Sequence, residues 1–375
     1  MISTPDALAR LCDRARAHEA VALDTEFVWE RTFRPALGVV QVGLGGDDVH
    51  LVDTVALAGA DLAPLGELLA DPETEVVLHD AIQDLQILAR ATGHRPRSVF
   101  DTQRFGGMVG QTASASLQDA VEWASGVRLD KGATRTNWLR RPLTDEQRRY
   151  AEDDVRYSLD VRAALIEEAE RRQRQGWFRE EMALYEDPAL YDEPDPMGAV
   201  RRVKLKGAKL DARSHAVLRH VAAWREREAD RLNRTRRMVL PDEALIEVAQ
   251  TRPADPRALG SVLTARQARG YADGLLRAVA SGEAAPPERR PRRPRLTREE
   301  KDRRQRLVRR VQDLVYGICE RGGVDPPLAA NKSQIVALVE AGGDAAPEAH
   351  PVLQGWRREF VGEAILKFLR AEAAA

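Results

Sequence analysis

Residues 21–28 read VALDTEFV, an apolar run that passes into alternating acidic and non-acidic positions. This pattern predicts a β-strand, on which successive side chains point to opposite faces of the sheet. Asp24 and Glu26 should therefore share one face, while Thr25 and Phe27 lie on the other. Two neighbouring carboxylates repel each other, and Mg²⁺ or Mn²⁺ would relieve that repulsion because hard cations prefer oxygen ligands. Taken alone, a solvated strand end is the alternative interpretation of this pair.

The composition is that of a soluble globular protein of 375 residues, a length that favours two or three domains. Because no apolar run of about 18 residues is present, no transmembrane helix is expected. The first residues lack the basic segment and apolar core of a secretory signal. Cys12 and Cys319 lie far apart and favour a reducing compartment over a disulfide framework. We therefore expect a cytoplasmic protein that does not contact membranes.

The charge of the chain is unevenly distributed. Residues 1–200 carry 22 Lys and Arg against 36 Asp and Glu, a net charge of −14, whereas residues 201–375 carry 36 against 23, a net charge of +13. An acidic half that holds the chemistry and a basic half that binds a polyanion would explain this difference. Two solvated domains that attract each other are the alternative.

Strand and helix patterns alternate along the N-terminal part. Thr4 is a candidate N-cap, and Gly93 is a candidate helix C-terminus. Gly45 to Asp48 form the turn of an initial hairpin. Strands are expected at 20–28, 37–43, 49–53, 75–79 and 99–101, and helices at 5–18, 61–70 and 81–92. Strands and helices that alternate after a hairpin predict an α/β fold with a mixed sheet flanked by helices.

Asp84 interrupts an apolar stripe of the helix expected at 81–92. The stripe is formed by Ala81, Leu85 and Leu88. An aspartate that faces a core has to be paired, hydrogen-bonded or bound to a metal. A capping or salt-bridged aspartate is the alternative to a metal ligand.

Tyr150 and Asp154 are four residues apart in a long helix expected at about 144–174, so they project from one face. Thr144, followed three residues later by a glutamine, gives the signature of a capping box at its start. Asp153 competes with Asp154 for a place beside Tyr150. The apolar neighbours do not decide between the two registers.

The combination of these motifs resembles the ribonuclease D family of 3′→5′ exonucleases, which use four acidic residues and a tyrosine. The resemblance covers roughly residues 1–200 and rests on several motifs in the family's order. The matching stretches are LDTEF (23–27), LHDAIQDLQIL (78–88), LDKGATRTNWLRRPLT (129–144) and YAEDDVRYSLDV (150–161). The resemblance implies a ribonuclease H-like fold for this part of the chain.

The resemblance also assigns roles to the motif residues. It implies that Asp24, Glu26, Asp84 and Asp154 bind metal and that Tyr150 lies beside the attacking water, so it favours Asp154 over Asp153. Carboxylates without Cys–His spacing suit two hard cations, Mg²⁺ or Mn²⁺, and not zinc. Two such ions about 3.5–4 Å apart would activate a water and stabilise the leaving 3′ oxygen. The expected products are nucleoside 5′-monophosphates.

A second group of residues is expected to contact the substrate. Phe27 has the side chain to stack on a terminal base, and Thr25 lies beside it in the acidic strand. His79 at a strand end is a candidate for lining the site, and Lys131 and Arg135 are candidates for meeting phosphates. The alternatives are core packing for Phe27, a structural histidine for His79, and a solvated loop for the two cations.

The basic half is expected to be helical. It resembles an HRDC domain, the small helical module that follows the exonuclease in ribonuclease D. A Pro- and Arg-rich stretch then separates this HRDC domain from a second, divergent HRDC-like bundle. The expected division is an exonuclease domain at 1–187, a linker at 188–206, an HRDC domain at 207–283, a second linker at 284–296 and the divergent domain at 297–375.

Together these features predict a metal-dependent 3′→5′ exoribonuclease that acts on RNA with a single-stranded 3′ end. The resemblance implies trimming of precursor tRNA and other small RNAs, and no obligate protein partner is expected. A DNA exonuclease is one alternative, because the same catalytic arrangement serves both polymers. A noncatalytic RNA-binding protein on a nuclease fold is the other.

Overall fold

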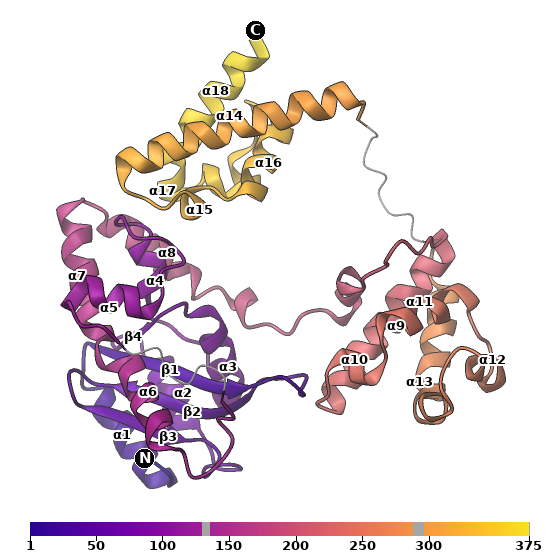
Figure 1. Ribbon diagram of the computed structural model, residues 1–375, viewed down its shortest axis with the longest axis horizontal. Coiled ribbons are helices and arrows are strands. Elements are labelled where there is room, and N and C mark those ends of the chain that lie inside the picture. Colours follow the sequence, from indigo (N-terminus) through magenta and orange to yellow (C-terminus); the bar gives the residue numbers. More distant parts are fainter. Residues whose placement is uncertain (130–135, 288–295, 375) are drawn as a thin grey trace. The chain divides into compact units, whose positions relative to one another are not determined.

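The computed structural model describes residues 1–129, 136–287 and 296–374, so Lys131 and Arg135 lie outside the described residues (Figure 1). The chain forms two compact units. Unit 1 comprises Met1–Phe27, Leu37–Tyr191 and Leu296–Ala375, and unit 2 comprises Val28–Ala36 and Asp192–Arg295. The C-terminal helices thus belong to the same unit as the N-terminal sheet, whereas the sequence suggests a separate third domain. The linker expected at 284–296 falls largely outside the described residues.

Unit 1 is built on a five-stranded sheet with the order β3-β2-β1-β4-β5. β2 and β3 pair antiparallel across the expected hairpin, and β1 pairs parallel with β4, which pairs parallel with β5. The predicted mixed sheet is therefore confirmed. The strands are β1 (Ala20–Val28), β2 (Ala36–Gly43), β3 (Val49–Asp53), β4 (Glu75–Leu78) and β5 (Val99–Asp101).

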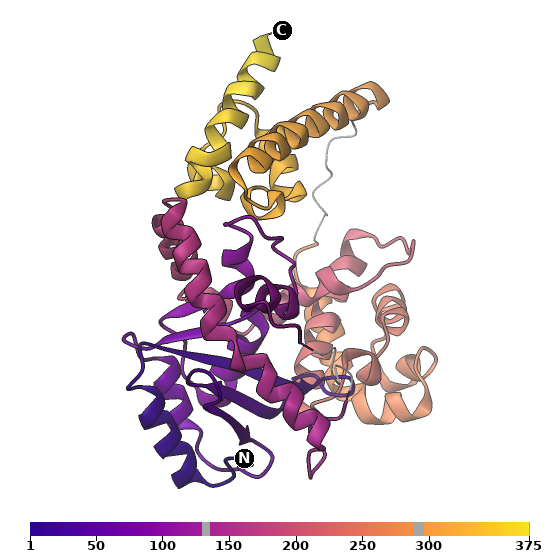
Figure 2. The same cartoon turned by 60° about the vertical axis from the view of Figure 1, so that its left-hand side comes forward.

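Helices cover both faces of this sheet, as Figure 2 shows from a second direction. Alternation along β4 separates two cores: Val76 and Leu78 pack into one with the first three helices, and Val77 packs into the other with the later helices. The first core involves α1 (Pro5–Ala15), α2 (Ala63–Leu69) and α3 (Ile82–Thr92). The second involves α4 (Thr102–Gly106), α5 (Leu117–Ser125), α7 (Ser158–Arg171) and α8 (Gln175–Leu184).

Local sequence signals place the helix ends correctly. Thr4 caps α1, Gly93 ends α3 in the left-handed conformation, and Thr144 forms a capping box with Gln147. The prediction of one long helix at 144–174 is wrong, however. Two helices, α6 (Asp145–Arg156) and α7, occupy this stretch and meet at Tyr157, although no glycine or proline marks the break.

Unit 2 is helical, and it begins before the expected HRDC boundary at 207. Two residues of the expected linker are buried in its core: Ala199, within a 3-10 helix at Pro196–Arg202, and Val203, which follows that helix. Its helices are α9 (Ala212–Arg231), α10 (Arg236–Val239), α11 (Asp242–Thr251), α12 (Pro256–Gly260) and α13 (Ala265–Ala284).

The short segment Val28–Ala36, which connects β1 to β2, also belongs to unit 2. Arg34 donates to Asp230 at 2.7 Å and pairs with Glu193 at 2.6 Å. The side chain of Asn233 accepts hydrogen bonds from the backbone of Phe33 and Arg34, at 3.2 Å each. These contacts anchor the segment to the residues around the end of α9.

The C-terminal helices of unit 1, drawn orange to yellow in Figure 1, contribute to the second core of the sheet. They are α14 (Arg298–Gly322), α15 (Pro326–Ala329), α16 (Lys332–Ala341), α17 (Gly355–Arg357) and α18 (Glu363–Ala374). None of the helices in the described ranges combines the length and the apolar character that crossing a membrane requires.

Candidate active site

Three carboxylates meet above the sheet. Asp24 and Glu26 of β1 and Asp154 of α6 each place an oxygen within 4.8 Å of the others. Val21 and Leu23 point into the core with α1 to α3, so alternation turns the two acids of β1 to the opposite face.

Helix α6 packs directly on that face because β2 has no side chain at Gly43. A Cβ at this position would lie 2.8 Å from the carbonyl oxygen of Val155 and 3.3 Å from the Cβ of Ala22. This close approach brings Asp154, the neighbour of Val155, to the two acids of the strand.

Asp84 approaches the site from α3, which packs on the opposite face of the sheet from α6. It lies in the first turn of α3 and accepts a hydrogen bond from the hydroxyl of Thr25, which is buried on the α3 side of β1. Thr25, expected to touch substrate, thus contacts Asp84. Asp84 is outside the group of three, but its charge raises the pKa of both Glu26 and Asp154.

Burial and mutual repulsion make these carboxylates hard to ionise. Burial, followed by the charges of Asp154 and Asp84, raises the pKa of Glu26 to about 8. Burial, followed by Asp153 and Asp84, raises the pKa of Asp154 to about 7. The pKa of Asp24 is also raised, by burial and then by the other three acids. For Asp84, burial raises the pKa to about 6.

The donor set fits a hard divalent cation. The charges that perturb Asp24, Glu26 and Asp154 are all carboxylates, and no Lys or Arg of the described ranges pairs with them. The cluster offers carboxylate oxygens and no histidine or cysteine, which suits Mg²⁺ or Mn²⁺ and not a structural zinc. Divalent cations would remove the repulsion that otherwise keeps the pKa values high.

Tyr150 lies one turn before Asp154 on α6. Burial, together with the charges of Asp154, Glu26 and Asp24, raises the pKa of Tyr150 well above its usual value, so the phenol stays protonated. Asp153, the competing candidate, instead accepts a hydrogen bond from Arg156 at 3.2 Å.

Trp138 lies within the motif stretch 129–144 but was not predicted as a site residue. Trp138 is buried, hydrogen-bonds to Glu26, and places its ring 6.1 Å from that of Tyr150. Gly38 of β2 makes this position possible, since a Cβ there would lie 2.5 Å from the Trp138 carbonyl oxygen.

Gln41 is a second residue that was missed. It is fully buried on β2 and donates to Asp24 at 3.3 Å, while its Oε1 atom has no partner. The sequence does mark Gln41 as unusual, because it is the polar residue in the otherwise apolar stretch 37–43. A buried amide in a strand needs a polar partner, and here the partner is an acid of the site.

The other expected substrate contacts differ in their surroundings. Phe27 is half-buried at the end of the acidic strand. Both ring nitrogens of His79 are close to internal partners, the hydroxyl of Thr102 at 2.8 Å and the carbonyl of Ala115 at 2.9 Å, an arrangement that fits the structural alternative.

Two families match different parts of the chain. The 3′-5′ exonuclease family matches residues 1–170, and the HRDC domain family matches residues 214–279. Over nearly the whole length, the chain is similar to ribonuclease D of Desulfotalea psychrophila, with 36% identity over 366 residues, 96% of each protein. It is 32% identical to ribonuclease D of Escherichia coli over 384 residues, which cover 99% of this chain and 98% of that protein.

A solved structure agrees with these similarities. The crystal structure of E. coli RNase D, described as an exoribonuclease involved in structured RNA processing, superposes with a TM-score of 0.81 at 31% identity. The superposition covers 99% of this chain and 98% of that one. The match extends through the C-terminal helices.

Replacing Asp24 by asparagine should lower RNA hydrolysis by at least about a thousandfold, the size of loss that single catalytic groups give. RNA binding, measured by fluorescence anisotropy, should remain largely intact because the fold is kept. Asp153→Asn is the matched control, since Asp153 lies next to the cluster but pairs with Arg156. Wild-type turnover in Asp24→Asn, or equal losses in both variants, would contradict the assignment.

The raised pKa values predict a pH-dependent stability without metal. A carboxylate whose pKa is higher in the folded state contributes stability that is present below its unfolded pKa, near 4, and lost as the pH rises through its folded value. In a chelator, the free energy of unfolding should therefore fall by several kcal/mol between pH 5 and pH 8, since one pKa unit is worth about 1.4 kcal/mol and the pKa values of Glu26 and Asp154 are raised to about 8 and about 7.

Urea unfolding at pH 5.5, 7 and 8, with chelator and with Mn²⁺, measures this effect. Mn²⁺ should restore stability most at pH 8, and Asp24→Asn should flatten the pH dependence in chelator. A wild-type protein equally stable at all three pH values in chelator would refute the proposed repulsion.

Proposed function

This chain belongs to the ribonuclease D family and is a 3′→5′ exoribonuclease of a metal-dependent fold, and from that premise we propose which residues bind the metal and how they act. We propose that Asp24, Glu26, Asp84 and Asp154 hold two divalent cations, Mg²⁺ or Mn²⁺. The observation that carries this proposal is the approach of three carboxylates to within 4.8 Å.

Asp24 is the ligand best placed to serve both cations. Its pKa responds to all three of the other acids, to Asp154, Asp84 and Glu26. Glu26 and Asp154 would help to hold one cation, and Asp84, which accepts a hydrogen bond from Thr25, would help to hold the other. When bound, the cations supply positive charge beside the scissile phosphate and lower the pKa of the attacking water.

The remaining residues of the site orient the reactants. Tyr150 keeps its proton and donates a hydrogen bond that aligns the attacking water, while Trp138 holds Glu26 and packs beside Tyr150. Attack on the terminal phosphodiester breaks the bond to the preceding 3′ oxygen. A nucleoside 5′-monophosphate leaves, and the shortened RNA keeps a free 3′ hydroxyl. We propose that Phe27, near the end of the same strand, meets the terminal base.

We propose precursor tRNA and other small structured RNAs as the substrates, with unit 2 as the part that binds the RNA body. The positive charge of the C-terminal half is concentrated there: residues 201–295 carry 23 Lys and Arg against 11 Asp and Glu, whereas residues 296–375 carry 13 against 12. Phosphate contacts by such a surface give sequence-independent affinity that falls with salt.

A groove between α9 and α13 is lined by arginines beside a largely buried tryptophan. Arg227 and Arg277 line it together with Trp224, and the ring of Trp224 meets that of Tyr271 edge-on at 5.5 Å. We propose that the arginines of this groove bind RNA phosphates. The enzyme would act in the cytoplasm, and its two buried, free cysteines fit a reducing compartment.

The activity is tested with matched 5′-labelled RNA and DNA strands that carry a single-stranded 3′ tail. The expected result is a ladder that shortens from the 3′ end, faster on RNA, with Mg²⁺ or Mn²⁺ and not with chelator. A precursor tRNA with a 3′ extension should be trimmed to a defined end. Shortening that persists in chelator, or a preference for DNA, would overturn the proposal.

The groove is tested with single arginine variants. Arg227→Ala and Arg277→Ala should each raise the KM for structured RNA about three- to tenfold, because each removes one phosphate contact, and leave kcat unchanged. Arg257→Ala removes the same charge from α12, outside the groove, and serves as the control. Equal changes of KM in all three variants would show that the groove has no special role.

A further inference from the structure

The carboxylate of Asp101, at the end of β5, holds the starts of two helices. Its oxygens accept hydrogen bonds from the backbone of Asp80 and Ala81, at 3.1 Å each, and from the backbone of Gln103 and Arg104, at 3.0 and 3.2 Å. The first pair belongs to the turn that leads into α3, and the second pair belongs to α4. Asp101 is buried, so water does not compete for these bonds.

The turn before α3 depends on this external support. Asp80 has a φ of +57°, a conformation that costs energy for a residue with a side chain. Ala81 occupies the N-cap of α3 and has no side chain able to cap the helix. Asp101, on the neighbouring strand β5, therefore replaces the local capping side chain by accepting hydrogen bonds from the backbone of this turn. Asp84 follows Ala81 by three residues, so the geometry of this turn fixes where Asp84 lies.

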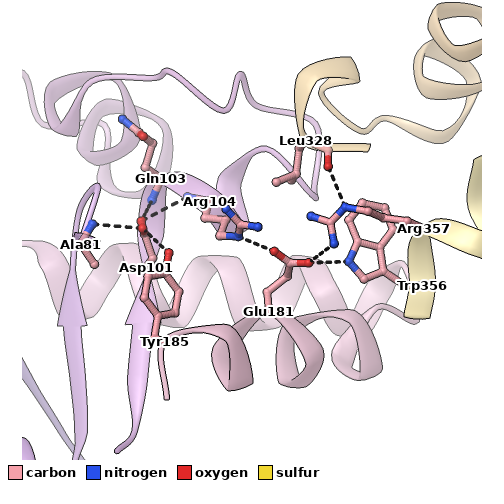
Figure 3. A network of polar contacts seen from close by, with 9 residues as sticks. All are labelled: Ala81, Asp101, Gln103, Arg104, Glu181, Tyr185, Leu328, Trp356 and Arg357. Atoms are coloured by element: carbon pink, nitrogen blue, oxygen red, sulfur yellow. Dashed lines mark hydrogen bonds and ion pairs between the residues drawn. The ribbon is translucent and has the colours of Figure 1, made fainter. Parts of the chain in front are cut away.

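Tyr185 in turn fixes Asp101. Its hydroxyl donates to Oδ2 of Asp101 at 2.6 Å, and both side chains are buried (Figure 3). Tyr185 is the residue that ends α8. Removing this hydroxyl would take away one of the donors that hold the Asp101 carboxylate against the turn.

Helix α8 also contacts the C-terminal helices, through Glu181 one turn earlier. Glu181 is buried and accepts hydrogen bonds from the indole of Trp356 at 2.7 Å and from Arg357 at 2.6 Å, and it pairs with Arg104. Arg357 further donates to the carbonyl of Leu328 at 3.0 Å. Figure 3 shows the resulting chain of contacts, from Leu328 and Arg357 through Glu181 and Arg104 to Asp101, which Tyr185 also contacts.

We propose that Asp101 and Tyr185 are positioning residues for the metal site, and that the C-terminal helices support them through Glu181. This inference rests on the proposed function, because it assumes that Asp84 is a metal ligand. It assigns the C-terminal helices a role in building the catalytic site, where the sequence suggests a separate, divergent HRDC-like domain. Asp101 and Tyr185 are both buried, so the proposed role is to position Asp84 and not to contact substrate.

The role follows from how a metal ligand works. A carboxylate displaced by a fraction of an ångström weakens metal binding strongly, whereas RNA contacts made elsewhere are unaffected. A positioning defect should therefore raise the metal concentration needed for activity and leave the KM for RNA unchanged. A general loss of stability would lower the fraction of active enzyme without changing the metal dependence of the rest.

Tyr185→Phe is the sharpest test, because it keeps the ring and removes only the hydroxyl. The expected result is a rise of at least threefold in the Mn²⁺ dissociation constant, measured by titration calorimetry without RNA, and in the half-saturating Mn²⁺ concentration for hydrolysis, with the KM for RNA within twofold of wild type. Tyr191→Phe is the matched control: Tyr191 also donates through its hydroxyl, at 2.5 Å, but to the backbone carbonyl of Tyr185 and not to Asp101. It should leave the Mn²⁺ dependence at the wild-type value.

A Tyr185→Phe enzyme with wild-type Mn²⁺ dependence would overturn the inference, and so would an equal shift in Tyr191→Phe. Excess Mn²⁺ should restore the turnover of Tyr185→Phe. Failure of excess Mn²⁺ to restore turnover would also count against a positioning role.

Two further variants complete the experiment. Trp356→Phe removes the indole donor to Glu181 and should shift the Mn²⁺ dependence in the same direction; a wild-type value would overturn the part of the inference that concerns the C-terminal helices. Asp84→Asn separates this inference from the proposed function. If Asp84→Asn retains wild-type turnover, the proposed metal site itself is wrong, whereas an inactive Asp84→Asn beside an unchanged Tyr185→Phe refutes only the inference.

Discussion

Repulsion between carboxylates is the constraint that the architecture of unit 1 has to withstand. Without metal, Asp24, Glu26 and Asp154 are held within 4.8 Å of each other in a partly buried site. Such an arrangement persists only where rigid elements impose it, and here a parallel strand and a helix packed against Gly43 do so. The site is thus preorganised at the expense of stability, which is the usual relation between strain and function in enzymes.

Much of this arrangement could be predicted because local rules decide it. Strand alternation places Asp24 and Glu26 together, and capping signals locate the starts of α1 and α6. What the sequence could not provide are long-range contacts. The hydrogen bond from Trp138 to Glu26 depends on a close backbone approach at Gly38, and the break at Tyr157 has no local signal. The placement of the C-terminal helices in unit 1 likewise depends on tertiary packing alone.

Glu181 shows why that placement is specific. A carboxylate buried so deeply would normally have a raised pKa, yet the hydrogen bond from Arg357 and the charge of Arg104 outweigh the burial and lower it. Removing one partner of such a buried group typically costs about 3–5 kcal/mol, whereas a well-satisfied group contributes little net stability. The network therefore does more to select one docking geometry for α8 and the C-terminal helices than to stabilise them.

The segment Val28–Ala36 limits how far the two units of the chain can be exchanged independently of each other. β1 carries two of the acids of the site, and the residues that follow them are anchored to Asp230 and Asn233 of unit 2. A genetic deletion that excised residues 192–295 as a cassette would strip this segment of its partners. Recombination or engineering that exchanges the HRDC region among relatives must therefore carry the β1–β2 connection along with it, as a single inherited block that is discontinuous in the gene.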